Sequence, residues 1–337
     1  MRISKRCKHD HIWNEAAWAA QEHRMRTQVL QAPDEESAWR IVVRESRTVL
    51  QTYSSSFFAV TRFLPAHKRA QVEVIYAAVR YPDEVVDTFP ISVNARAARL
   101  RTWREGYERG LEAESIQSAV RAGVPCFVAA LARVVRDCGI PHEHYRAFLN
   151  AMMRDVYPQR YQTLDDLIDS YIYGSAIVVG YFLTHVYGSS SPCQFDRALN
   201  AARDLGIALQ LTNFCRDVTD DQRRGRQYLP LDVLMKEGLS CVNTADTSQH
   251  AALNRVIREV GFVARDYYRR ALANLDAFHA DSRIAIRACI DVYGQLNDRI
   301  CSSPNGLTHR ESVPLSQKFR VLPTSKYWRL PLAYLGW

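Results

Sequence analysis

The sequence predicts an all-α protein on the strength of three observations. Glycine and proline are scarce, with 14 and 13 among 337 residues, whereas Ala, Leu, Arg and Glu are plentiful, a composition that favours helices. From about residue 41 to about residue 300 the chain divides into helix-like segments separated by short breaks. No alternating run of polar and apolar residues with turns at strand spacing occurs, so a sheet is not expected.

The helical segments are bounded by short clusters of helix-breaking residues. We expect breaks at residues 64–65 (LP), 139–141 (GIP) and 188–192 (GSSSP). The predicted parts are a charged arm over residues 1–40, one main helical domain over residues 41–300, and a basic and aromatic tail over residues 301–337. With 47% hydrophobic residues, the main domain is large enough to bury a substantial core.

Charge and cysteine content restrict the partners and the compartment. The formal net charge of +8 indicates an anionic partner, such as a diphosphate or an anionic lipid. Nucleic acid is not expected, because the chain has no zinc knuckle, RNA-binding aromatic motif or concentrated basic run. The eight cysteines include no CxxC pair, which suits unpaired thiols in a reducing compartment. We therefore expect a cytoplasmic protein.

Membrane association is expected to be peripheral at most. The first thirty or so residues are charged and lack the apolar stretch of a signal peptide. The most apolar run, residues 172–183, is shorter than a membrane span and is interrupted by Gly174, Ser175 and Gly180. Trp and Tyr with Lys326 and Arg329 in the tail suit a membrane surface, the alternative being a tail folded back over the domain.

Two pairs of aspartates carry the clearest chemical signal. Asp83 and Asp87 are four residues apart in one helix-like segment, and Asp217 and Asp221 are four apart in another. Four helical steps of ~100° bring the second carboxylate to within about 40° of the first, so each pair shares a helix face. Mg²⁺ suits such oxygen ligands and completes its shell with water and phosphate oxygens. Two such faces looking at each other would hold a metal–diphosphate complex.

The later pair lies in a segment with two distinct stripes. The polar stripe recurs at spacings of three and four and consists of Ala202, Gly206, Gln210, Asn213, Asp217 and Asp221. The apolar stripe, about 100° away, consists of Ile207, Leu211, Phe214 and Val218. A polar wall of a cavity and an amphipathic surface helix both fit this pattern. The following loop favours the cavity, because Arg223, Arg224 and Arg226 around a glycine suit diphosphate oxygens.

The earlier pair lies in a segment with a similar arrangement. Tyr76 and Arg80 precede the two acids on the same predicted face. Pro82 is expected to kink the helix just before Asp83, because it removes a backbone donor. Glu84 is expected to face solvent rather than to supply a further carboxylate.

A third pair, Asp165 and Asp169, has the same spacing but a different context. It follows Thr163 and lies where a helix is expected to begin, and acids in a first turn complement the helix dipole. We interpret this pair as structural.

Four ordered motifs resemble those of the squalene/phytoene synthase family, whose members join two prenyl diphosphates head to head. Residues 54–57 (SSSF) followed by Leu64-Pro65 are similar to its opening serine motif, and residues 76–87 (YAAVRYPDEVVD) to its first aspartate-rich motif. Residues 160–167 (RYQTLDDL) with 171–176 (YIYGSA) resemble its central motif. Residues 210–218 (QLTNFCRDV) through 225–230 (GRQYLP) resemble its second aspartate motif, and the likeness covers roughly residues 45–300.

The resemblance implies a single-domain, all-α isoprenoid synthase bundle with a central active-site cavity, in which residues 41–300 form the catalytic domain. It implies that Mg²⁺, or alternatively Mn²⁺, is held by Asp83, Asp87, Asn213, Asp217 and Asp221. It implies that diphosphate is bound by Ser54, Ser56, Tyr76, Arg80, Arg216, Arg226 and Tyr228. Tyr171 and Gln210 would border the reacting carbons, with Tyr171 as a catalytic residue beside the four aspartates. The chain departs from the family pattern at Pro82, Asp83 and Glu84, where the family often has two adjacent aspartates. This departure bears on the metal geometry at the first aspartate motif.

The expected reaction is Mg²⁺-dependent condensation of two prenyl diphosphates through a cyclopropyl diphosphate. An apolar pocket with aromatic faces would shelter the cation, and Tyr171, Tyr173 and Tyr181 are candidates to line it. We predict geranylgeranyl diphosphate as donor and phytoene as product, as in bacterial members of the family. NADPH is not expected, because no glycine-rich dinucleotide fingerprint appears. Small residues at positions 174–176 and at Gly180 would leave depth for a C20 tail.

Three alternatives remain open at this point. A C30 synthase making squalene or dehydrosqualene would use the same two aspartate motifs. A prenyltransferase of the same fold would pass one allylic group to a small aromatic acceptor. A non-catalytic assembly factor could keep the fold, although a binding-only protein has no physical need for two facing acid pairs.

Overall fold

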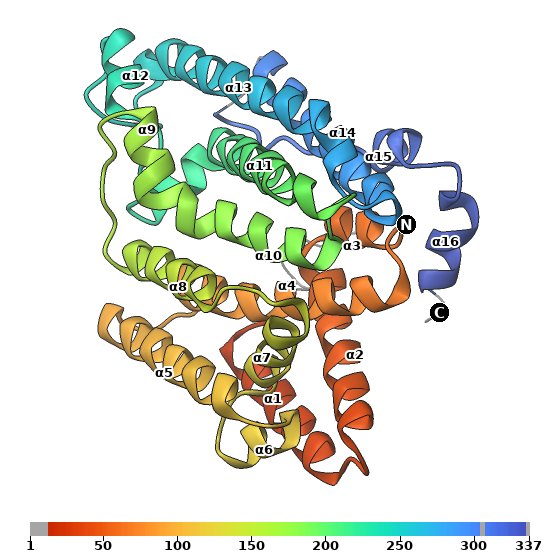
Figure 1. Cartoon of the computed structure of the whole chain (residues 1–337). Coiled ribbons are helices and arrows are strands. Elements are labelled where there is room, and N and C mark those ends of the chain that lie inside the picture. Colours follow the sequence, from red (N-terminus) through yellow and green to blue (C-terminus); the bar gives the residue numbers. More distant parts are fainter. Residues whose placement is uncertain (1–12, 304–306, 335–337) are drawn as a thin grey trace, which may run out of the picture. The chain divides into compact units, whose positions relative to one another are not determined.

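The structure, a computed structural model, describes residues 13–303 and 307–334 and is built from helices (Figure 1). Within these ranges the extended pairing amounts to one isolated antiparallel bridge between Ser189 and Phe278. The all-α prediction is therefore confirmed. The chain divides into two compact units, one of residues 1–58 and 70–137 and the other of residues 59–69 and 138–337.

The first unit contains the helices of the N-terminal part of the chain. They are α1 (Glu15–Gln31), α2 (Glu35–Tyr53), the beginning of α3 (Ser55–Thr61), most of α4 (Ala66–Asp87), α5 (Val93–Glu112), α6 (Ile116–Arg121) and nearly all of α7 (Cys126–Cys138). Residues 13–31 of the expected arm thus belong to this unit, while residues 1–12 lie outside the described part. The predicted boundaries of arm, catalytic domain and tail stay predictions.

The second unit contains the helices of the C-terminal part. They are α8 (His142–Val156), α9 (Leu164–Leu167), the π-helix η1 (Ile168–Ile177), α10 (Val178–Tyr187), α11 (Phe195–Arg223), α12 (Leu231–Lys236), α13 (His250–Ala273), α14 (Ala280–Ser302), α15 (Leu315–Val321) and α16 (Lys326–Tyr334). Three short 3₁₀ turns also belong to it, namely η2 (Pro192–Gln194), η3 (Thr247–Gln249) and η4 (Leu275–Ala277).

The helix boundaries follow from breakers and capping residues. The three predicted breaks fall between α3 and α4, between α7 and α8, and between α10 and η2, so all three are confirmed. At several starts a side-chain oxygen accepts a hydrogen bond from a free backbone N–H of the first turn. The capping residues are Asn14, Asp34, Ser92, Ser115 and Thr163. Asp165 lies in the first turn after Thr163, as the structural interpretation of that pair predicts.

Aromatic side chains make up the centre of the first unit. Trp18 of α1 is 3% exposed and packs edge-on against Tyr81 of α4 and Phe127 of α7. Tyr81 also stacks on Trp103 of α5, with ring centroids 4.2 Å apart. The Trp18 indole N–H donates to the hydroxyl of Tyr53 at 2.9 Å, so its polar atom is satisfied within the core.

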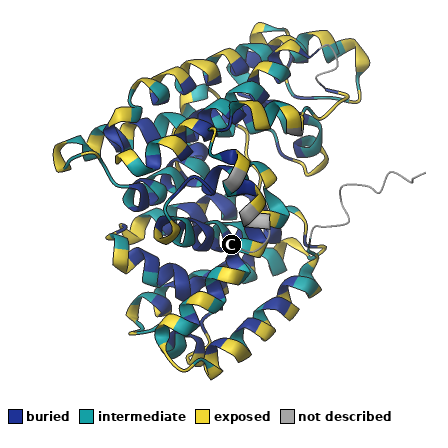
Figure 2. Ribbon diagram, turned by 90° about the vertical axis from the view of Figure 1, so that its right-hand side faces the viewer, coloured by how far each residue is buried: buried dark blue, intermediate teal, exposed yellow. Residues whose placement is uncertain are grey.

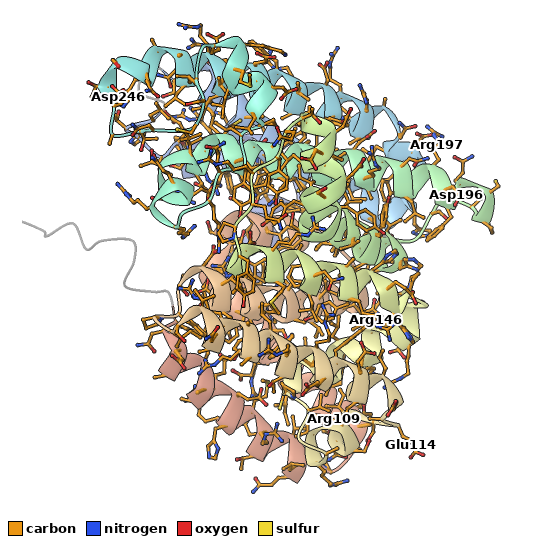
Figure 3. All side chains as sticks on the ribbon, turned by 90° about the vertical axis from the view of Figure 1, so that its left-hand side faces the viewer. Arg109, Glu114, Arg146, Asp196, Arg197 and Asp246 are labelled. Atoms are coloured by element: carbon orange, nitrogen blue, oxygen red, sulfur yellow. The ribbon has the colours of Figure 1, made fainter. Side chains whose placement is uncertain are left out.

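Helix α11 is the centre of the second unit. It contacts α10, η1, α13 and α14, and Figure 1 shows these helices running around it. Because α11 is covered on several sides, its apolar stripe is buried, and Ile207 and Leu211 are fully inaccessible to solvent. In Figure 2 the long helices of this unit carry a buried stripe and an exposed one. Figure 3 shows Asp196 and Arg197 at the outer end of the same helix, where charged side chains project outward.

Glycines let the helices around α11 approach closely. A Cβ added at Gly174 would lie 2.6 Å from the carbonyl oxygen of Ala147 in α8, and one at Gly180 would lie 2.9 Å from that of Ala202 in α11. Both glycines therefore face neighbouring backbones. The expectation that they leave depth for a long substrate tail is wrong for these two positions, because a helix already fills the space beside each.

The central apolar run is longer than the sequence suggested. Residues 164–187 form one continuous helical stretch, long and apolar enough by composition to cross a membrane. Half of its most apolar window is buried inside the protein, and the stretch packs against α8 and α11. The expectation from the sequence that no run reaches the length of a membrane span is thus wrong. The packing of this stretch is that of a core helix.

The C-terminal helices use their basic side chains internally. Lys326 is 7% exposed, and its ammonium group donates to the carbonyl oxygens of Phe319 and Arg320 at the end of α15. The Arg329 guanidinium donates to the carbonyl oxygen of Arg62 at 2.9 Å. The Arg329 contact joins the tail to the rest of the second unit, whereas the Lys326 contacts lie within the tail. Neither cation is presented toward an anionic surface.

Candidate active site

One face of α11 carries the predicted metal-binding acids. The helix runs unbroken from Phe195 to Arg223, so Asn213, Asp217 and Asp221 recur along one side of it. The side chains of Asp217 and Asp221 are only 17% and 12% exposed. Because both carboxylates are largely buried, the alternative of a solvated surface helix fails here.

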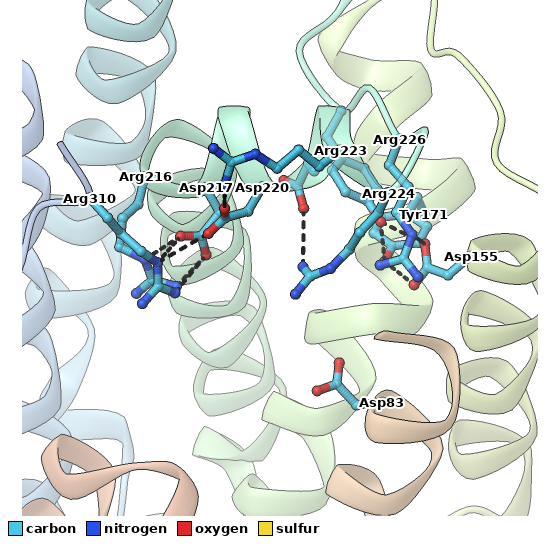
Figure 4. A network of polar contacts seen from close by, with 12 residues as sticks. Asp83, Asp155, Tyr171, Arg216, Asp217, Asp220, Arg223, Arg224, Arg226 and Arg310 are labelled. Atoms are coloured by element: carbon cyan, nitrogen blue, oxygen red, sulfur yellow. Dashed lines mark hydrogen bonds and ion pairs between the residues drawn. The ribbon is translucent and has the colours of Figure 1, made fainter. Parts of the chain in front are cut away.

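Asp217 is held by two arginines from different parts of the chain. Nε of Arg216 donates to its Oδ1 at 2.8 Å, and Nε of Arg310 donates to the same oxygen at 2.8 Å. Figure 4 shows both guanidiniums pointing at this carboxylate. Burial opposes ionisation, but hydrogen bonds and charge from Arg216 and then Arg310 outweigh it and lower the pKa of Asp217. The group is therefore a carboxylate at neutral pH.

A tight turn places further arginines next to these acids. Gly225 has a φ of +74°, a conformation that glycine adopts without strain, and it reverses the chain after α11. The backbone N–H of Arg226 donates to the carbonyl oxygen of Asp221 at 2.9 Å. The Arg224 guanidinium lies 3.8 Å from the Asp221 carboxylate. The end of α11 thus combines acids with guanidiniums, which suits a metal–diphosphate group better than either alone.

The donor set of α11 fits a hard cation that keeps water and substrate oxygens. Within the described residues no group of three or more His, Cys, Asp or Glu side chains is gathered as a closed metal cage. Mg²⁺ does not require such a cage, since it is usually bound by one or two carboxylates with water and phosphate oxygens. Asp217 and Asp221, one turn apart and largely buried, supply carboxylates of that kind, although Arg216 and Arg310 occupy Asp217 in this structure.

A buried carboxylate lies among the tyrosines of the second unit. Asp155, near the end of α8, accepts hydrogen bonds of 2.6 Å from the hydroxyls of both Tyr171 and Tyr228. The Arg226 guanidinium lies 4.0 Å from the same carboxylate and is 7% exposed as a residue. Figure 4 shows Tyr171 and Arg226 converging on Asp155. The Tyr228 hydroxyl, predicted to bind diphosphate, is engaged here by a carboxylate.

Aromatic rings surround these hydroxyls. Phe214 of α11 stacks on Tyr228 with centroids 4.2 Å apart, and Tyr171 lies 4.9 Å from Tyr228. Of the three tyrosines expected to line a pocket, Tyr171 lies in this cluster, and the lining role of Tyr173 and Tyr181 stays a prediction. Tyr173 is 42% exposed, and Tyr181 packs against His144 instead. Tyr171 and Tyr173 point to different sides of the helix, because two residues span roughly half a turn.

In the first unit, α4 carries the other predicted acids. The helix continues through buried Pro82 to Asp87, so the proline does not end it. Arg80 pairs with Asp83 at 2.6 Å and also with Glu84. Glu84 is completely buried and accepts a hydrogen bond of 2.6 Å from Thr88. The prediction that Glu84 faces solvent is wrong, because it lies ~100° around the helix from Asp83 and so points into the core.

The opening serine motif lies beside α4 in the same unit. Ser54 Oγ accepts a hydrogen bond of 3.2 Å from the backbone N–H of Phe57 and so caps α3. Phe57 lies against the ring of Tyr76, with centroids 5.9 Å apart. The Arg80 guanidinium covers the ring of Tyr53 at 4.3 Å. The diphosphate-binding roles of Ser54, Ser56, Tyr76 and Arg80 stay predictions, as do the roles of Gln210 and Arg216 in the second unit.

Each unit thus brings together its own share of the predicted site. Asp83 and Asp87 lie in the first unit with Arg80, while Asp217, Asp221 and Tyr171 lie in the second. That the two acid faces look at each other stays a prediction.

Two residues of the second unit that contact the candidate site were not predicted from the sequence. Arg310 lies 93 positions from its partner Asp217 in a segment without a regular pattern, so no signal pointed to it. Asp155 did carry a signal. It lies in the last turn of α8, where a negative charge opposes the helix dipole and therefore requires compensation from elsewhere.

The sequence is similar to known proteins over most of its length. The squalene/phytoene synthase profile matches residues 50–318. A 15-cis-phytoene synthase of Enterobacter agglomerans is 30% identical over 81% of this chain and 91% of its own length. One from a Paracoccus species is also 30% identical, over 88% of this chain and 90% of its own.

Solved structures agree on the fold. A dehydrosqualene synthase in complex with ligand superposes with a TM-score of 0.73 at 21% identity, covering 89% of this chain and 99% of that one. A squalene synthase from Alicyclobacillus acidocaldarius gives a TM-score of 0.64 at 21% identity, covering 81% and 97%. The chain belongs to the squalene/phytoene synthase family and is an enzyme of the prenyltransferase type that this family comprises.

Proposed function

We propose that the protein condenses two molecules of geranylgeranyl diphosphate head to head to give phytoene, through a cyclopropyl diphosphate. One observation carries this proposal. Helix α11 presents buried acids with arginines at Asp217 and Asp221, and on its neighbouring stripe it presents Phe214 to a buried cluster of tyrosines. A charged end that suits diphosphate beside an aromatic interior that suits a carbocation is what allylic ionisation requires.

The residues of α11 are proposed to hold the metal. Asp217, Asp221 and Asn213 would be the ligands in the second unit, and Asp83 and Asp87 those in the first. A bound Mg²⁺, or Mn²⁺ in its place, would supply positive charge for the departing diphosphate oxygens. The fit rests on two largely buried carboxylates one turn apart on α11.

Side chains of the protein supply further positive charge for the diphosphate and aromatic faces for the cation. Arg216 is kept charged because hydrogen bonding to Asp217 outweighs the effect of burial and raises its pKa, so it can share the diphosphate charge. The rings of Phe214, Tyr171 and Tyr228 present π faces and few nucleophilic atoms. Burial and the neighbouring Asp155 raise the pKa of Tyr171 far above 10, so its hydroxyl stays protonated and does not attack the cation.

The geranylgeranyl donor is proposed on the strength of the named relatives. The two bacterial relatives described above are 15-cis-phytoene synthases that this chain matches over most of their length. The squalene and dehydrosqualene synthases are similar at 21% identity and bear on the fold alone. Loss of a proton ends the phytoene route, so NADPH is not part of the proposal.

The setting of the reaction is proposed to be the cytoplasm, with peripheral membrane contact through which an apolar product could leave. Lys326 and Arg329 are engaged with backbone carbonyls, so this contact would have to use other groups of the tail. Tyr327, 68% exposed, is one such group.

A single incubation tests the reaction class. With geranylgeranyl diphosphate and Mg²⁺ as the only additions, we expect a C40 hydrocarbon and inorganic diphosphate in a ratio of one to two. A prenyltransferase that needs an aromatic acceptor would leave the donor unconsumed under these conditions. Detection of the hydrocarbon by mass spectrometry separates the two functions, and a chelator should stop its formation.

A further inference from the structure

The buried carboxylate of Asp155 is bound by two phenols at once. Its Oδ2 is 2.6 Å from the Tyr171 hydroxyl, and its Oδ1 is 2.6 Å from the Tyr228 hydroxyl. The two hydroxyl oxygens are 3.3 Å from each other. Asp155 is 7% exposed, and the rings of both tyrosines are buried as well. These contacts are therefore shielded from bulk water.

The number of available protons decides the direction of each hydrogen bond. Each phenol has a single O–H proton. Separations of 2.6 Å are typical of a hydroxyl that donates to a carboxylate. If both protons point at Asp155, neither is left for the contact between Tyr171 and Tyr228. Both oxygens then present only lone pairs on their other side.

The surroundings account for an anion at this buried position. The Arg226 guanidinium lies 4.0 Å from Asp155 and supplies positive charge. Asp155 lies one residue before the end of α8, where the helix dipole disfavours a negative charge. Two phenol donors and the nearby Arg226 charge compensate this position, and an apolar residue of similar size would pack there without them. The negative charge of Asp155 is therefore not required for packing.

We propose that Asp155 is a positioning residue for the reaction, because it holds the Tyr171 hydroxyl with its proton turned away from the reacting carbons. The Tyr171 oxygen then faces the cation with its lone pairs, as the negative end of a fixed dipole. Tyr228 occupies the other carboxylate oxygen and keeps Asp155 from rotating. The inference rests on the proposed function in one respect, namely that Tyr171 borders the reacting carbons.

Asp155→Asn is the informative change, because the amide keeps the shape but accepts on one side only. One of the two phenols must then turn its O–H proton away from position 155. We expect this change to disturb the fixed dipole of the Tyr171 hydroxyl that the reaction uses. With geranylgeranyl diphosphate as substrate, we expect kcat to fall by at least about tenfold while KM stays within about twofold. Asp276→Asn, an exposed carboxylate paired with Arg197, is the matched control and should leave both constants unchanged.

A spectroscopic measurement separates positioning from structural support. In protein labelled at tyrosine ¹³Cζ, the resonances of Tyr171 and Tyr228 are assigned from the two single Phe variants. Asp155→Asn should move both resonances and no others. This readout needs no substrate, so it tests whether Asp155 holds both phenol protons even if geranylgeranyl diphosphate is not consumed. Absence of phytoene from the wild-type protein would refute the proposed function alone.

The same substitution in a chain that lacks both phenol hydroxyls provides a second test. In a chain that carries Tyr171→Phe and Tyr228→Phe, adding Asp155→Asn should lower kcat by less than about twofold. An equal loss in both backgrounds, or unmoved resonances in folded protein, would overturn the proposal. If Asp155→Asn does not fold, Tyr228→Phe alone leaves the carboxylate to Tyr171 and should move the Tyr171 resonance. A Tyr171 resonance that stays in place would likewise overturn it.

Discussion

Asp217 is ionised in the folded protein because two arginines offset the effect of its burial. Its neighbour in sequence, Arg216, supplies one of them, and Arg310 supplies the other. The sequence predicted the acid correctly as part of a polar stripe on α11. It could not predict Arg310, because that contact depends on tertiary folding and not on helical spacing.

Replacing Asp217 tests the proposed metal site. Asp217→Ala should lower kcat more than about 100-fold under saturating Mg²⁺, because one of two carboxylates on the α11 face is lost. Steady-state kinetics with a chelator-treated control measures this effect. Asp165→Ala, at an exposed pair of equal spacing, should stay within about threefold of wild type. Near-normal activity of both variants would show that the metal assignment is mistaken.

Glu84 shows where residue-level prediction failed. Asp83 and Glu84 are adjacent acids, and the sequence offered no reason to bury one rather than the other. The helix places them ~100° apart, so Asp83 lies at the edge of the unit while Glu84 is fully buried against Arg80 and Thr88.

Glu84→Gln should destabilise the first unit by about 2 kcal/mol, because the half-buried Arg80 guanidinium loses its fully buried carboxylate partner. Urea unfolding followed by circular dichroism measures the loss. Glu114→Gln provides a control of the same chemistry at a surface position and should change the free energy of unfolding by less than about 0.5 kcal/mol. Equal stability of both variants would mean that Glu84 is not a structural partner of Arg80.

At the scale of elements, the long helices were predictable and the π-helix was not. The stripes of α11 repeat at three and four residues, so its length and its buried face follow from the sequence. In η1 (Ile168–Ile177) the chain departs from that repeat, so the directions in which Tyr171 and Tyr173 face did not follow from the sequence. Only packing against α8 and α11 decides which of these rings is buried.

The glycines of this region give a prediction about packing. Gly174→Ala should destabilise the protein by about 2 kcal/mol, because the new Cβ would lie 2.6 Å from the Ala147 carbonyl oxygen and the two helices must separate. Gly294 in α14 has nothing within 4 Å of an added Cβ. Gly294→Ala should therefore stabilise by up to about 1 kcal/mol. Thermal unfolding of the pair measures both signs, and a loss at Gly294 as large as at Gly174 would argue against the packing explanation.

At the scale of the molecule, segments far apart in the sequence are tied by a partly buried ion pair. The ammonium group of Lys68 lies 2.6 Å from the Asp281 carboxylate and also donates to the Tyr187 carbonyl oxygen at 2.7 Å. It thus joins the beginning of α4 to the end of α10 and the beginning of α14. Burial opposes ionisation of Asp281, but hydrogen bonds from Lys68, His279 and Ser282 outweigh it and lower its pKa to about 2.

This ion pair predicts a pH dependence of stability. The folded-state pKa of Asp281 lies below the unfolded value, so its contribution is complete above about pH 4 and is lost as the pH falls towards 2. Asp281→Asn should therefore cost about 1 kcal/mol at pH 7, a figure reduced because the carboxylate is partly exposed. The difference between variant and wild type should shrink between pH 4 and pH 2. Urea unfolding at several pH values measures it, and a difference that does not change with pH would rule out this linkage.

The length of the product depends on the whole cavity and was the least predictable property. Two of the glycines that suggested depth for a C20 tail face the backbones of α8 and α11 instead. The preference for phytoene therefore rests on the relatives, which match the chain at 30% identity over most of their length. With farnesyl and geranylgeranyl diphosphate at equal concentration, we expect a C40 hydrocarbon to exceed C30 by at least about tenfold, since five extra carbons gain several kcal/mol on burial. Mass spectrometry of the extracted hydrocarbons decides the matter. Exclusive C30 product would exclude phytoene synthesis but would not affect the proposed metal site, which is argued from α11, or the family assignment, which rests on the matched profile and relatives.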